Sequence, residues 1–138
     1  WTNFIYIRYA EVLLTYAEAR NENLSAPDAK VYDAVNQIRK RVNLPGLEEG
    51  LSKDQMRDAI RLERRLELAF EGIHLFDTRS YRTTEKDVTK PVYGIDPDGK
   101  KILIETRKFN PNRDYLWAIP LKEIDLSQGV LKQNPEWD

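Results

Sequence analysis

The segment from Glu63 to Gly72 constrains the fold most, because it places carboxylates on a helix face that should be apolar. At about 100° per residue, Met56 and Ile60 extend this face, whose other members are Ala59, Leu62, Leu66, Ala69 and Phe70. Viewed down the helix axis, Glu63 falls inside this face, and the direction of Glu67 lies between those of Met56 and Ile60. A half-buried carboxylate is costly unless it is paired and hydrogen-bonded. The two glutamates therefore indicate a structural ion lock, a metal site or an acid/base pair.

Composition and charge narrow the class of protein. The chain has 138 residues, of which 41% are hydrophobic and 33% charged, as expected for one domain or a large piece of one. A net charge of -1 gives no support for nucleic-acid binding, and no apolar run approaches the ~20 residues of a membrane-spanning helix. The lack of cysteine excludes a thiolate metal site. Because the chain begins at Trp1 inside a helical pattern, we expect a fragment whose N-terminal part, with any targeting signal, is missing.

The first half of the chain, residues 1–72, has the periodicity of helices. From Phe4 to Glu22 the pattern is apolar nearly all round, which predicts a helix packed on more than one side. Its tyrosines are expected in the core; they are Tyr6, Tyr9 and Tyr16. A second helix is expected after Ser25, an N-cap residue followed three positions later by Asp28. Its single apolar stripe comprises Val31, Ala34, Val35, Ile38 and Val42, and Asn43-Leu44-Pro45-Gly46 ends it.

The third helix starts at a capping box formed by Ser52 and Gln55 and is expected to end at Gly72. A helical hairpin followed by a third helix is the unit of a helical-repeat stack of the tetratricopeptide type. Arg64 lies at the edge of the apolar face and could pair inward, whereas three arginines are expected to face water: Arg57, Arg61 and Arg65.

The second half, residues 73–138, is irregular. Short β-like runs at Val92-Tyr93 and at 101–106 flank the turn sequence Asp96-Pro97-Asp98-Gly99, which predicts a small β-hairpin. Trp117 lies in an apolar run and is expected in the core, and the tail after Leu121 has room for one helical turn. The fold class that follows is mainly α, with an irregular C-terminal half that contains a small hairpin.

Several blocks of the sequence, in order, resemble the SusD/RagB family of surface nutrient-binding lipoproteins. The blocks are Arg8 to Ala19, Val35 to Arg39 with Leu44-Pro45, Glu63 to Gly72, Phe76 to Arg79 with Tyr81, Lys90 to Gly94, Tyr115 to Pro120, and Gln133 to Pro135. The chain departs from the family pattern at His74, Thr78, Tyr81, Ala118 and Glu136-Trp137. The resemblance covers nearly the whole chain, residues 1–138, as the C-terminal portion of a longer protein.

The resemblance implies a function without catalysis. It implies a helical part, 1–72, on which the irregular segment 73–138 packs, and a place at the cell-surface side of the outer membrane. Attachment there would depend on a lipid anchor in the missing N-terminal part. The implied partners are a TonB-dependent transporter of the SusC kind and an oligosaccharide or peptide ligand, mostly a glycan. No cofactor is implied, and this region would be mainly scaffold and docking surface. A helical-repeat adaptor that binds another protein is the alternative.

For the acidic pair we favour the structural ion lock. The carboxylates are expected to accept hydrogen bonds from arginines such as Arg8, Arg39, Arg41 or Arg79, or from backbone N–H groups of the tail. The residues assigned to this lock are Glu63, Arg64, Glu67, Glu71, Asp77 and Arg79. We interpret the lock as the polar clamp that seats the irregular half on the helices.

The sequence gives weaker support to two other kinds of site, a catalytic or metal site and a ligand-stacking site. A metal-dependent enzyme could use Glu71 and His74, which form a Glu-x-x-His pattern, but a di-iron bundle needs that element twice and the chain has one histidine. His74 is expected to be a half-buried residue just past a helix end. Glutamates one turn apart on one helix point the same way and do not flank a substrate bond. For ligand stacking, the candidates are the loop aromatics Tyr81, Tyr93 and Trp137.

Overall fold

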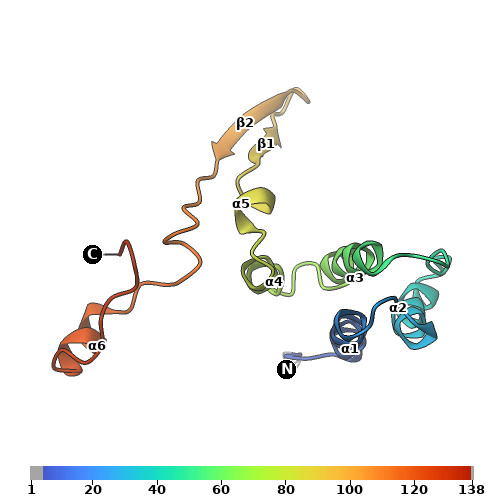
Figure 1. Ribbon diagram of the computed structural model, residues 1–138. Coiled ribbons are helices and arrows are strands. Elements are labelled where there is room, and N and C mark those ends of the chain that lie inside the picture. Colours follow the sequence, from blue (N-terminus) through green and yellow to red (C-terminus); the bar gives the residue numbers. More distant parts are fainter. Residues whose placement is uncertain (1–4, 138) are drawn as a thin grey trace. The chain divides into compact units, whose positions relative to one another are not determined.

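The structure is a computed structural model that describes residues 5–137. The described chain is mainly helical, with one two-stranded sheet (Figure 1). The elements are α1 (Tyr9–Asn23), α2 (Ala29–Arg41), α3 (Lys53–Glu67), α4 (His74–Ser80), α5 (Thr84–Asp87), β1 (Pro91–Ile95), β2 (Lys101–Thr106) and α6 (Leu121–Leu126). They form two compact units, a helical unit that ends at His74 and a C-terminal unit that begins at Leu75.

Side-chain caps fix where α2 and α3 begin. Asp28, not Ser25, caps α2, and its carboxylate accepts a hydrogen bond from the Val31 amide at 3.2 Å. At α3 the expected capping box is present, since the Gln55 amide donates to Ser52 Oγ while Gln55 Oε1 accepts from the Ser52 amide. Both caps satisfy N–H groups that have no partner inside the helix.

Helix α1 is shorter than expected and is exposed on one side. It begins at Tyr9, and the expected start at Phe4 lies outside the described residues. Helix α1 packs against both α2 and α3 and buries Leu14 and Ala17 there. The expectation that these tyrosines are core residues is wrong for the described chain, because Tyr6, Tyr9 and Tyr16 are all exposed.

The core of the helical unit is formed by one stripe from each helix. Besides Leu14 and Ala17 it contains Val31, Ala34, Val35, Ile38, Met56 and Ile60. The stripe expected on α2 is confirmed except for Val42, which is exposed at the C-cap. On α3 only one edge of the expected apolar face is buried: Met56 and Ile60 are core residues, whereas Leu62 and Leu66, and Phe70 after the helix, are exposed.

Helix α3 ends at Glu67, one turn before the expected stop. The guanidinium of Arg8 donates a hydrogen bond to the main-chain carbonyl of Glu67, and the amide of Glu71 donates to the Leu68 carbonyl instead. The chain then turns through two residues with left-handed backbone, Phe70 at φ 66° and Gly72 at φ 79°. An arginine from outside the helix therefore takes the acceptor that another helical turn needs.

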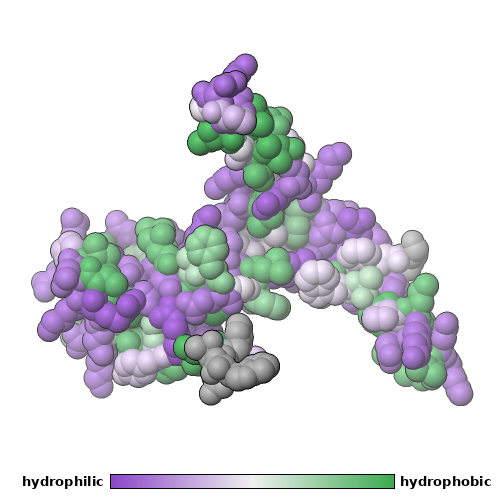
Figure 2. All heavy atoms as spheres, turned by 180° about the vertical axis from the view of Figure 1, so that it is seen from behind, coloured by the Kyte–Doolittle hydropathy of each residue, from purple (hydrophilic) through white to green (hydrophobic). Residues whose placement is uncertain are grey.

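The C-terminal unit contains the expected hairpin and more helix than expected. Strands β1 and β2 pair antiparallel, with Tyr93 opposite Leu103 and a register shift between Val92 and Tyr93. The hairpin is largely exposed, and Figure 2 shows green, hydrophobic side chains over it. Helices α4 and α5 occupy a segment that was expected to be irregular. His74 is exposed and starts α4, so its expected half-buried position past a helix end is wrong.

None of the described helices has the length and apolar character that crossing a membrane demands.

Candidate functional site

Glu63 is buried and bound by one arginine of α2. Its Oε2 accepts a hydrogen bond from Arg39 Nη1 at 2.8 Å, and the side chain of Glu63 is 8% exposed. Arg39 also donates through Nε to the carbonyl of Pro45 at 2.8 Å, in the segment after α2. The pair therefore connects the last turns of α2 and α3, and the second bond fixes the direction of the guanidinium.

Glu67 is bound by two arginines from different elements. Arg41 Nη2 donates to both carboxylate oxygens at 2.7 Å, and Arg8 Nη1 donates to Oε1. Arg8 also donates to Glu71, through Nε at 3.0 Å and Nη2 at 2.8 Å. The hydrogen bonds from Arg8 lower the pKa of the Glu71 carboxyl, and those from Glu71 and Glu67 raise the pKa of Arg8.

These contacts form one cluster at one end of the helical unit. We call it the arginine–glutamate cluster; its members are Arg8, Arg39, Arg41, Glu63, Glu67 and Glu71. It joins the residue before α1 to the last turns of α2 and α3. Its carboxylates accept hydrogen bonds from guanidinium groups that stay protonated at any physiological pH, so it has the chemistry of a structural link rather than of an acid/base pair.

Two residues assigned to the lock from the sequence lie elsewhere. Asp77 and Arg79 belong to α4 in the C-terminal unit. Arg79 Nη2 donates to the Asp114 carbonyl at 2.9 Å, and its guanidinium lies 4.4 Å from the ring centroid of Trp117. The arginines that bind the glutamates come from the helical unit itself, so the cluster holds helices to each other. The interpretation that this cluster also seats the irregular half on the helices stays a prediction.

A second set of charged pairs, which the sequence analysis missed, runs between α1 and α3. We call it the α1–α3 ladder; its pairs are Glu11–Arg64, Glu18–Arg61 and Glu22–Arg57. The order of the partners shows that the two helices run antiparallel. Arg57 and Arg61 are half-buried, so the expectation that they face water is wrong. The hydrogen bond from Arg57 lowers the pKa of the Glu22 carboxyl. The signal in the sequence was acids on one helix and bases on another, each spaced by one or two turns.

Arg64 has a buried side chain and bonds toward α1. Its Nη1 donates to Thr15 Oγ1 at 3.4 Å and its Nη2 lies 3.5 Å from Glu11 Oε1. It thus belongs to the ladder, on the α1 side of the helix, rather than to the arginine–glutamate cluster. A buried arginine that contacts two groups of one neighbouring helix fixes the register between the two helices.

The loop aromatics proposed for stacking are placed differently from one another. Trp137 is half-buried, and its Nε1 donates to the Leu116 carbonyl at 3.0 Å. Tyr81 is half-buried as well. Tyr93 on β1 is exposed, with Lys101 Nζ 3.9 Å from its ring centroid. Trp117, expected in the core, is 63% exposed, and the guanidinium of Arg79 packs on its ring.

The end of the chain binds the apolar run that precedes α6. Gln133 makes two hydrogen bonds to one residue: its Oε1 accepts from the Ile119 amide at 2.8 Å and its Nε2 donates to the Ile119 carbonyl at 2.9 Å. Asn134 Nδ2 donates to the Trp117 carbonyl at 2.6 Å. Because an irregular segment has no regular ladder for its backbone groups, these amide side chains supply the missing partners.

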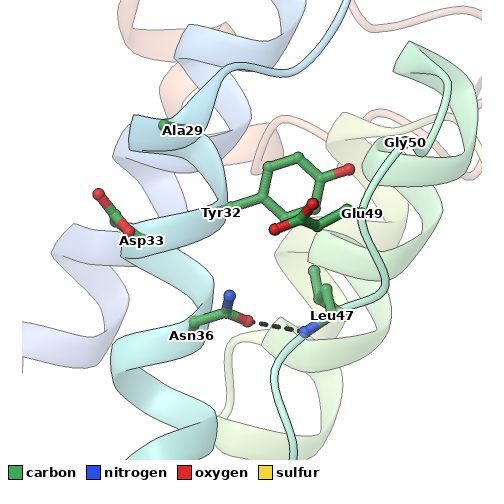
Figure 3. Close-up of a pocket in the computed structure, with 7 residues that line it drawn as sticks. All are labelled: Ala29, Tyr32, Asp33, Asn36, Leu47, Glu49 and Gly50. Atoms are coloured by element: carbon green, nitrogen blue, oxygen red, sulfur yellow. Dashed lines mark hydrogen bonds between the residues drawn. The ribbon is translucent and has the colours of Figure 1, made fainter.

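A recess of about 410 Å³ lies between α2 and the segment that leads to α3 (Figure 3). Tyr32 and Asn36 line it from α2, and Leu47 and Glu49 line it from the segment. The Leu47 amide donates to Asn36 Oδ1 at 2.8 Å, the bond drawn in Figure 3. Gly46 lies close by, and a Cβ there would lie 3.1 Å from Asn36 Nδ2, so a larger residue would push the Asn36 side chain aside. A third segment residue, Leu51, donates its amide to Tyr32 Oη at 2.9 Å.

Comparison with known proteins places these features in a family. The model of the SusD family matches residues 2–137. The chain belongs to the SusD family. It is 36% identical over 141 residues to the SusD-like protein P2 of Formosa agariphila, covering 97% of this chain and 26% of that protein. It is 39% identical over 106 residues to the SusD-like protein P38 of the same organism, covering 70% of this chain and 20% of that protein.

Solved structures of SusD-like proteins share the fold. A crystal structure of a SusD-like protein from Bacteroides fragilis matches with a TM-score of 0.85 at 36% identity, covering 99% of this chain and 26% of that one. The crystal structure of a SusD homologue from Bacteroides thetaiotaomicron matches with a TM-score of 0.72 at 30% identity, covering 95% and 26%. This SusD-family chain therefore spans about a quarter of the length of the relatives it matches, and the resemblance and the mainly helical fold class expected from the sequence are confirmed.

Proposed function

We propose that this chain is the C-terminal part of a nutrient-binding protein without catalytic activity, and that the nutrient is a glycan. Membership of the SusD family supports the proposal. In the helical unit the buried carboxylates Glu63 and Glu67 are held by guanidinium groups, an arrangement that serves structure. Among the described residues, no three side chains of the metal-binding types gather around a common point.

The observation that carries the scaffold role is the charged network of the helical unit. The arginine–glutamate cluster and the α1–α3 ladder together bind all three helices. Purple, hydrophilic side chains cover much of this unit in Figure 2. Helices that are connected by ion pairs in this way keep their arrangement when a ligand or partner binds. We infer that this region supports the ligand site of the whole protein and presents a rigid docking surface.

The protein is proposed to act at the cell-surface side of the outer membrane, where a lipid anchor in a longer chain would hold it. Its partner is proposed to be a TonB-dependent transporter of the SusC kind, to which the ligand is delivered. The test is co-purification of the tagged full-length protein from solubilised outer membranes. A TonB-dependent transporter in stoichiometric yield supports the proposal, and recovery of the protein alone contradicts it.

A protein-binding adaptor is the second candidate, and one observation favours it. Leu62 and Leu66, one helical turn apart on α3, and Phe70, just after the helix, are exposed and form an apolar strip. Apolar strips of this kind mark packing or binding surfaces. If the strip binds a separate protein, Leu66→Lys in the full-length protein abolishes that complex and leaves the unfolding free energy unchanged. If the strip is covered by the remainder of the protein, the same change destabilises the fold.

A further inference from the structure

The recess beside α2 is held open by hydrogen bonds of its own walls. The segment that carries Leu47 and Glu49 is tied to α2 at two points, through Asn36 Oδ1 and through Tyr32 Oη. The volume of about 410 Å³ lies within the range of small-molecule sites, roughly 300–1,000 Å³. A ligand that enters therefore meets walls that are already in place, and little ordering of the protein opposes its binding.

The polar groups of the recess keep unused hydrogen-bonding capacity. Asn36 Oδ1 accepts the Leu47 amide, which identifies the other terminal atom as the donor Nδ2, and Figure 3 shows that atom on the side of Tyr32. Within residues 5–137, Asn36 Nδ2 donates to no group. The hydroxyl of Tyr32 accepts from Leu51 and keeps its own proton for a further bond.

Glu49 differs from most acids of the helical unit. The carboxylates of the arginine–glutamate cluster and of the α1–α3 ladder each form an ion pair with a basic side chain, and Asp28 pairs with Arg20. The described chain provides no ion pair for Glu49. Asp33 also borders the recess, but its carboxylate points away from the other side chains in Figure 3. The recess thus offers one acceptor carboxylate, one amide donor and one phenol.

The combination of these groups identifies the class of ligand. A pyranose ring carries neighbouring hydroxyl groups that both donate and accept, and it has C–H faces that pack on an aromatic ring. A cation would bind Glu49 but would face the donor N–H groups of Asn36, and an apolar ligand would leave the half-buried Asn36 amide without a partner. We propose that this recess is a binding subsite for a single sugar residue, a choice of ligand that rests on the proposed glycan-binding function.

The experiment follows Leu47, whose side chain lines the recess. Full-length protein with ¹³C-labelled leucine methyl groups is titrated with methyl α-glucopyranoside, methyl β-galactopyranoside and N-acetylglucosamine, and the Leu47 resonances are assigned by their loss in Leu47→Met. At least one sugar is expected to shift these resonances to saturation. Glu49→Gln should weaken that binding about tenfold, because one charged acceptor is lost. The control Glu48→Gln, at an exposed neighbour outside the recess, should leave it unchanged.

Two outcomes overturn the proposal: Leu47 resonances that respond to none of the three sugars, and a binding midpoint that Glu49→Gln leaves unchanged. The same protein is tested separately for retention by polysaccharides in native gels. Retention together with unresponsive Leu47 resonances rejects the recess and leaves the proposed function standing. Saturable shifts at Leu47 without any retention reject the proposed function and leave the recess as a sugar site.

Discussion

Replacing Glu67 by alanine tests the arginine–glutamate cluster most severely. The side chain of Glu67 is 8% exposed and accepts hydrogen bonds from Arg8 and Arg41. Removing one partner of a buried ion pair costs about 3–5 kcal/mol when the other charge stays buried and unpaired. In this cluster the loss is smaller, because Arg8 keeps Glu71 as a partner and Arg41 is 59% exposed and regains water. We expect Glu67→Ala to lower the free energy of unfolding by about 2–4 kcal/mol.

The measurement is urea denaturation of the full-length protein at neutral pH. Glu48→Ala is the matched control, since Glu48 is exposed and belongs to neither charged set; its effect should stay within about 0.5 kcal/mol. A double-mutant cycle with Arg41→Ala separates the contribution of that pair from those of the other partners. If Glu67→Ala is no more destabilising than the control, the cluster does not hold the three helices together and the reasoning is refuted.

Three further predictions concern single interactions. Asp28→Asn keeps an N-cap but removes the carboxylate whose pKa the hydrogen bond from Arg20 lowers to about 2. The loss of stability relative to wild type should therefore be full above pH 3.8, the ordinary pKa, and should disappear as the pH falls toward 2. A loss that does not change with pH in urea titrations contradicts this. Gln133→Ala should cost about 1–3 kcal/mol and speed hydrogen exchange at the Ile119 amide, and unchanged exchange rejects the role assigned to Gln133. Gly72→Ala, at φ 79°, should cost about 1 kcal/mol in thermal unfolding, and a stabilised variant contradicts the left-handed turn.

Local signals in the sequence predicted local structure well. The capping box of Ser52 and Gln55, the α2 stripe and the turn at 96–99 each depend on residues that are close along the chain. The hairpin followed because its two strands are joined by that turn. These features are decided by backbone geometry and side-chain reach within a few residues, and the rest of the protein does not change them.

The predictions that failed concern features that depend on which other elements pack against a helix. Periodicity predicted one wide apolar face on α3, but only the positions of α1 and α2 decide that Met56 and Ile60 are buried and that Leu66 is exposed. For the same reason the sequence predicted that Arg57 and Arg61 face water. Their acidic partners, Glu22 and Glu18, lie 35 and 43 positions earlier in the chain. The residues of the recess gave no signal, since Asn36 and Glu49 come together only through the path of the intervening segment.

Binding of an intact glycan is the central claim, and one measurement tests it most directly. The full-length protein is run in native gels that contain a panel of polysaccharides, and each polysaccharide is incubated with the protein and assayed for new reducing ends. The account predicts retardation by at least one polysaccharide with no release of reducing ends. Release of reducing ends would identify an enzyme, and mobility unchanged in every gel would show that glycans are not the ligand; either result contradicts the account.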